Sequence, residues 1–141
     1  PYTTLFRSTY EVNVLGPVQV TQAFLPLLRQ GEQKNIINVS SELGSLGLHS
    51  YPDFAYHGVN IFSYNSSKTA LNAFTVLLAK ELKPEGFRVN AVNPGYTATD
   101  LNQHSGPLPP EEAAATIVQY AVQGTGGPTG GFFVRDGQVP W

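Results

Sequence analysis

Alternation of short apolar runs with amphipathic helices is the feature that most constrains the fold of this chain. Residues 35–40 and 88–92 are apolar runs typical of strands buried in a parallel sheet. Between them, residues 66–82 carry apolar side chains at helical spacing and end at a Pro-Glu-Gly turn. Residues 10–28 show a similar apolar stripe ahead of the first strand. This order predicts parallel strands joined by right-handed helical crossovers.

The C-terminal third continues the same pattern. A third helix is predicted after Pro109-Pro110, because proline and the two following glutamates suit a first helical turn. Residues 132–134 predict a final strand. The glycine-rich segment 124–131 predicts a turn rather than a phosphate-binding loop, since Pro128 interrupts it and a strand follows. We therefore expect an α/β fold with three parallel strands and flanking helices.

Composition excludes several classes of function. The net charge is −2 and no basic run alternates with aromatic residues, so nucleic acid is not an expected partner. No apolar stretch approaches the ~20 residues of a membrane span, so none is predicted. The chain has no cysteine, which excludes disulfides and thiolate metal sites and is compatible with a cytoplasmic protein. Its three histidines lack ligand spacing, and no metal is expected.

The motif Tyr64-Asn-Ser-Ser-Lys68 is the strongest candidate for chemistry. Residues four apart at a helix start lie on one face, so the phenol and the ammonium are expected to be neighbours. A nearby ammonium favours the phenolate and lowers the pKa of a tyrosine from its usual value of about 10. The alternative is a surface tyrosine beside a solvated lysine.

Ser41 ends the first predicted strand, at the carboxyl edge where open α/β sheets bind their ligands. A hydroxyl at that edge can donate to a carbonyl oxygen as negative charge develops on it. Two other serines compete for this role. Ser40 precedes it directly, and Ser50 stands nearer to Tyr64 in the sequence. A purely structural role for Ser41, capping local backbone, is the remaining alternative.

Asn13 lies four residues before Pro17 in the first predicted helix. Proline has no N–H, so the carbonyl of Asn13 loses its usual helical donor and needs another partner, such as a water. The alternative is that Gly16-Pro17 begins the helix and Asn13 is an N-terminal cap residue.

Taken in order, these motifs resemble the short-chain dehydrogenase/reductase family. The resemblance covers the strand ending in Ser-Ser, the Tyr-x-x-x-Lys helix and the strand that runs into Asn93-Pro-Gly95, and it extends from about Tyr10 to Trp141. It implies the C-terminal half of a Rossmann-like doubly wound parallel sheet. It also implies that Tyr64 is the general acid of carbonyl reduction, that Ser41 assists it, and that Asn13 and Lys68 complete a proton relay.

The same resemblance implies an NAD(P)(H) cofactor, with NADP(H) favoured over NAD(H), and a ketone or aldehyde as small-molecule substrate. Residues 42–63 show no periodicity and predict a long loop. Within this loop, the segment 49–57 is rich in Tyr, Phe and His. This segment and the C-terminal tail resemble the corresponding parts of carbonyl reductases. Residues 101–109 would form a mobile substrate lid. The full-length protein is expected to be a monomer or a homodimer. The residues implied to contact the cofactor are Asn38, Tyr64, Lys68, Pro94, Gly95, Thr97 and Thr99.

The start of the chain has a separate interpretation. Residues 1–8, PYTTLFRS, read as the in-frame translation of a common sequencing adaptor, and we expect them to be a non-native tail. Residues 9–141 would then be the C-terminal part of a single domain, since no Gly-rich strand-to-helix turn of the dinucleotide-binding type occurs in the chain. The alternative for residues 1–8 is an ordinary N-terminal strand rich in threonine and aromatic residues.

This interpretation has structural and functional consequences. The strand at residues 35–40 is expected to have an unpaired edge, and the chain by itself is expected to be inactive. Three other functions remain open: a non-catalytic nucleotide-sensing or partner-binding relative, a sugar epimerase or dehydratase of the same fold, and a serine hydrolase. The serine hydrolase is the weakest of these, because no Gly-x-Ser-x-Gly elbow occurs.

Overall fold

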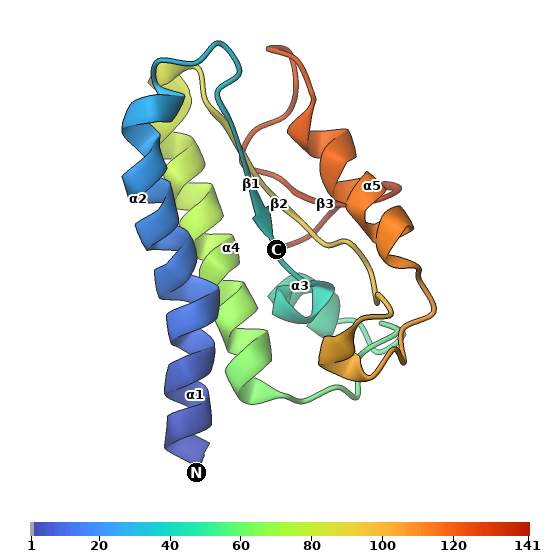
Figure 1. Ribbon diagram of the computed structural model, residues 1–141. Helices are drawn as coiled ribbons and strands as arrows, with labels where there is room; N and C mark the ends of the chain where they lie inside the picture. Colours follow the sequence, from blue (N-terminus) through green and yellow to red (C-terminus); the bar gives the residue numbers. More distant parts are fainter. Residues whose placement is uncertain (1) are drawn as a thin grey trace.

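The computed structural model describes residues 2–141, and its first element is one long helix. Helix α1 (Tyr2–Tyr10), the π-helical segment η1 (Glu11–Leu15) and helix α2 (Gly16–Leu28) follow one another without a break (Figure 1). The helix predicted from Tyr10 is therefore confirmed, but it begins at Tyr2.

An N-terminal strand, the alternative for this region, is wrong. The Phe6 ring stacks on Tyr10, one helical turn on, with centroids 4.6 Å apart, and it lies 5.6 Å from the Phe62 ring. This contact between residues four apart is a helical one. Pro1 lies outside the described residues, and the adaptor origin of residues 1–8 stays a prediction.

The remaining elements follow the predicted alternation. The predicted second helix starts at Phe62 rather than Ser66, so Tyr64 lies inside its first turn. The expected loop at 42–63 contains two short helical turns. In chain order the elements are β1 (Asn35–Val39), η2 (Glu42–Gly44), α3 (Leu46–His49), α4 (Phe62–Leu82), η3 (Lys83–Glu85), β2 (Arg88–Val92), η4 (Asp100–Asn102), α5 (Pro110–Ala121), β3 (Phe132–Val134) and β4 (Gly137–Val139).

The sheet has the order β1-β2-β3-β4. Strands β1, β2 and β3 are parallel, as predicted, with Asn35 opposite Arg88 in register. Strand β4 pairs antiparallel with β3 and was not predicted. The sequence does indicate this hairpin, because the dipeptide Asp136-Gly137 is typical of a tight turn between two strands. In the structure, Gly137 has a positive φ of 139°. The sheet is therefore mixed, with three parallel strands and a short antiparallel edge.

Helices cover both faces of the sheet. Helices α1, α2 and α4 lie on one side and α5 on the other (Figure 1). Each face has its own apolar cluster, as expected for a doubly wound fold. The first contains Ile36, Leu78, Ala79, Leu82, Phe87 and Val89. The second contains Val92, Tyr120 and Phe133, with Ile37 and Ile117 packed against them.

Strand β1 lies at one edge of the sheet. Its only partner strand within residues 2–141 is β2, so its other edge is open, as predicted. No helix in this part of the chain is long and apolar enough to cross a membrane. The same residues contain no group of His, Asp and Glu side chains that could hold a metal ion.

Candidate active site

A cavity of about 660 Å³ is lined by residues that follow the carboxyl ends of β1 and β2 and by the start of α4. This is the edge where ligands bind in open α/β folds. It brings together most of the side chains that the sequence singles out, and two predicted residues, Asn13 and Asn38, lie elsewhere. The predicted residues that line it are Ser41, Tyr64, Lys68, Pro94, Gly95, Thr97 and Thr99.

Ser41 and Tyr64 meet in this cavity. Ser41 has an extended backbone (φ −150°, ψ 144°) that ends the strand, and its Oγ caps the following turn by accepting from the Leu43 N–H at 3.2 Å. The Ser41 side chain also lies near enough to the Tyr64 phenol to favour its ionised form. The two competing serines are used differently. Ser40 is buried and donates to Asn72 Oδ1 at 2.6 Å, and the exposed Ser50 donates to the Gly47 carbonyl at 2.6 Å.

Lys68 lies one helical turn after Tyr64, with its Nζ 5.7 Å from the centroid of the phenol ring. The ammonium donates to the Val39 carbonyl at 3.0 Å. Burial raises the pKa of Tyr64, and the nearby Ser41 hydroxyl opposes this rise. Burial lowers the pKa of Lys68. No effect of Lys68 accompanies these two causes, so the expected lowering of the Tyr64 pKa by Lys68 is not found.

The turn after β2 forms a second wall of the cavity. Gly95 has a φ of +94°, a conformation that favours glycine. Its N–H donates to Asn93 Oδ1 at 3.2 Å, and its carbonyl accepts from Thr97 Oγ1 at 3.1 Å. Thr99 caps the short helix η4 through a reciprocal pair of hydrogen bonds with Asn102. The segment predicted as a lid starts at this helix, and its mobility stays a prediction.

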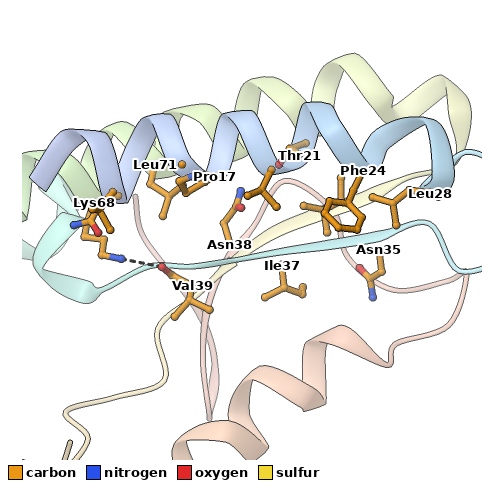
Figure 2. A pocket seen from close by; sticks show the side chains of 15 residues that line it. Pro17, Thr21, Phe24, Leu28, Asn35, Ile37, Asn38, Val39, Lys68 and Leu71 are labelled. Carbon is orange, nitrogen blue, oxygen red and sulfur yellow. Dashed lines mark hydrogen bonds between the residues drawn. The ribbon is translucent and has the colours of Figure 1, made fainter. Parts of the chain in front are cut away.

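Asn13 and Asn38 line a separate groove between α2 and β1, shown in Figure 2. Asn13 Nδ2 donates to Ser67 Oγ at 3.0 Å, and Asn38 Nδ2 donates to Thr75 Oγ1 at 2.9 Å. Both amides are thus held by α4. Lys68 and Val39 line both this groove and the candidate cavity, so the Lys68 side chain lies where the two meet.

The backbone around Asn13 changes its helical type. The N–H of Gly16 donates to the carbonyl of Glu11, five residues back, and Glu11–Leu15 is π-helical. Pro17, which has no N–H, follows directly. The alternative in which Gly16-Pro17 begins the helix is wrong, because the helix is continuous through this point. Irregular turns of this kind inside helices often occur at functional sites.

Glu42 is a cavity residue that sequence reasoning missed. Its Oε2 accepts from Asn93 Nδ2 at 2.6 Å, which joins the ends of β1 and β2. Burial raises the pKa of the Glu42 carboxyl, and the hydrogen bond from Asn93 opposes this rise. The sequence places Glu42 directly after Ser41, which was the only indication that it could reach the cavity. A single glutamate after a strand is usually solvated, so this position alone does not predict a role in the site.

We expect Glu42→Gln to stabilise the fold at neutral pH. A raised pKa means that the folded state favours the neutral carboxyl. The neutral carboxyl therefore adds to the free energy of unfolding, and this contribution is complete below the ordinary pKa of 4.5. It is lost as the pH rises through the raised pKa of Glu42 in the folded state. Gln keeps an acceptor for Asn93 and removes the charge. Thermal melting should show a higher Tm for the variant at neutral pH and a smaller difference in acid. Exposed Glu32→Gln is the control, and a difference independent of pH would contradict this account.

Comparison with known proteins identifies the family. The sequence model of the short chain dehydrogenase family matches residues 2–108. The chain belongs to this family. It is 36% identical to (−)-isopiperitenone reductase of Mentha piperita over an alignment that covers 88% of the chain and 49% of the reductase. It therefore spans about half the length of this curated relative.

Solved structures of the family show the same arrangement of elements. The carbonyl reductase Sniffer of D. melanogaster superposes with a TM-score of 0.80 at 28% identity, covering 98% of this chain and 58% of Sniffer. An NADPH-bound carbonyl reductase from chicken fatty liver superposes with a TM-score of 0.76 at 25% identity, covering 98% and 57% of the two chains. These similarities confirm the resemblance inferred from the motifs and the partial Rossmann-like fold.

Proposed function

We propose that residues 9–141 are the catalytic half of a longer NADP(H)-dependent reductase that converts a ketone or aldehyde to an alcohol. The observation that supports this most directly is the meeting of Ser41 and Tyr64 in one cavity, with Lys68 one helical turn away. The names of the related reductases agree with it. The proton relay, the cofactor contacts and the preference for NADP(H) belong to this proposal.

The residues present fit a dinucleotide at the edge of the cavity. Lys68 uses one of its three N–H donors on the Val39 carbonyl, which leaves two for ribose hydroxyls. The turn at Pro94 and Gly95 brings backbone close to the cavity, and Thr97 and Thr99 add hydroxyls for a carboxamide. When bound, the reduced nicotinamide supplies the hydride.

The protein side of the reaction is proton transfer and charge stabilisation. The raised pKa of Tyr64 keeps its phenol neutral at physiological pH, which is the form that can donate to a carbonyl oxygen. The Ser41 hydroxyl, which lines the same cavity near that phenol, is placed to stabilise the negative charge that develops on the same oxygen. Lys68 and the groove beyond it, with Asn13, provide the route by which Tyr64 is reprotonated. Asn38 supports this region from β1 through its bond to Thr75.

The direct test is NADPH oxidation by the full-length protein with a panel of ketones, aldehydes and quinones. We expect consumption of NADPH that depends on the carbonyl compound and yields the corresponding alcohol. Binding of NADPH with no turnover of any carbonyl would contradict the proposal and favour a non-catalytic relative. Nothing in the site specifically favours a sugar epimerase.

A further inference from the structure

Glu42 places a carboxylate in the lining of the cavity. It is the only carboxylate among the described residues that line the cavity, and it follows Ser41 directly. Because the lining is otherwise mainly apolar and uncharged, a carboxylate here has a large effect on which substrates fit.

The Glu42 carboxylate has no cationic partner within residues 2–141. None of the ion pairs in this part of the chain involves it: they join Arg29 to Glu85, His104 to Asp100 and Arg135 to Glu112. Its one hydrogen bond comes from the neutral amide of Asn93. A half-buried carboxylate with a neutral donor alone is under-compensated, and a bound positive charge would restore the balance.

The role of holding Asn93 in place uses only one of the two oxygens of the Glu42 carboxylate. Asn93 Oδ1 accepts from the Gly95 N–H, so the bond from Nδ2 to Glu42 Oε2 helps to orient the turn after β2. A neutral glutamine could accept that bond equally well. The second oxygen, Oε1, has no hydrogen-bond partner among the described residues, and it is the atom that remains for a ligand.

Two tyrosines accompany Glu42 in the lining of the cavity. Tyr56, from the segment 49–57, and Tyr96, from the turn after β2, both line it. Burial raises the pKa of Tyr56, and the nearby Glu42 charge adds to the rise. Aromatic faces beside a carboxylate suit an alkylammonium group, because ring faces and carboxylate both attract a cation.

Lys68, the cationic residue of the cavity, does not neutralise Glu42. The Lys68 ammonium donates to the Val39 carbonyl and forms no ion pair with Glu42. In the proposed mechanism it serves the ribose. The cavity therefore combines Tyr64 and Lys68 with a carboxylate at Glu42 that has no cationic partner in this part of the chain, and with the aromatic side chains of Tyr56 and Tyr96.

We propose that this enzyme prefers carbonyl substrates that carry a protonated amine, and that Glu42 pairs with that ammonium while the carbonyl reaches Tyr64. This inference rests on the proposed function for the carbonyl, but the recognition of the cation is a separate property of the cavity.

The test compares two ketones of nearly identical shape. One is acetophenone with a para-dimethylaminomethyl group, protonated at neutral pH, and the other is its neutral counterpart with a para-isobutyl group. Calorimetry on the full-length protein with the oxidised dinucleotide NADP⁺, which cannot reduce a ketone, gives the affinity for each. We expect the cationic ketone to bind about tenfold more tightly, as a charge-assisted hydrogen bond provides.

Glu42→Gln should abolish most of this preference, whereas the matched charge change Glu32→Gln on the surface should leave the ratio of the two affinities as it is. Equal affinity of the wild type for both ketones would overturn the inference, as would an unchanged ratio in Glu42→Gln. Turnover with NADPH is measured separately on the same proteins. A preference in binding without turnover would support the cation site and reject the proposed reductase function.

Discussion

Replacing Tyr64 by phenylalanine is expected to lower kcat for carbonyl reduction by about 10²–10⁴-fold, the range for loss of a positioned general acid. Phenylalanine keeps the ring and its packing and removes only the hydroxyl that lies near Ser41. NADPH binding should survive, because the donors of Lys68 are untouched. Single-turnover measurements of NADPH oxidation in the full-length protein would separate loss of chemistry from loss of binding.

A matched control is available in the same region. Tyr51 lies in the segment 49–57, is exposed and does not line the cavity. Tyr51→Phe makes the same chemical change away from the proposed site and should leave the rate near that of the wild type. A Tyr64→Phe enzyme as fast as the Tyr51→Phe control would remove Tyr64 from the mechanism.

Sequence alone predicts the part of the site that depends on strand order and helical spacing. Ser41 follows an apolar strand and Tyr64 opens an amphipathic helix. The parallel topology that brings them together follows from the alternation of elements. The helix near Asn13 was predicted to lose a backbone bond at Pro17, and the structure has a π-helical segment immediately before that proline.

Other features depend on packing that the sequence pattern does not report. The pKa of Tyr64 is governed by burial rather than by Lys68, and the extent of burial is set by tertiary packing. Glu42 looks like a solvated glutamate until the end of β2 brings Asn93 against it. Asn38 lies two residues after Ile36 on β1 and so shares its face toward α4, where its amide is used by Thr75 rather than in the candidate cavity.

Close backbone approach is a second property that sequence hides, and Gly44 is its clearest case. Gly44 belongs to the turn that Ser41 caps, and this turn lies against α4. A Cβ added at Gly44 would lie 2.6 Å from Lys68 Cβ and 2.7 Å from the Lys68 carbonyl carbon. Real side chains do not tolerate such distances to backbone, so either the turn or the helix must move.

Gly44→Ala is therefore expected to destabilise the fold by about 3 kcal/mol, at the upper end of overpacking effects, and to lower Tm by roughly 5–10 °C. The movement separates the turn that holds Ser41 from the helix that holds Tyr64 and Lys68, so kcat should fall as well. Gly58→Ala is the control, because a Cβ there meets nothing within 4 Å. If Gly44→Ala melts and turns over like the control, then the turn and α4 are not packed together, and the meeting of Ser41 with Tyr64 loses its structural basis.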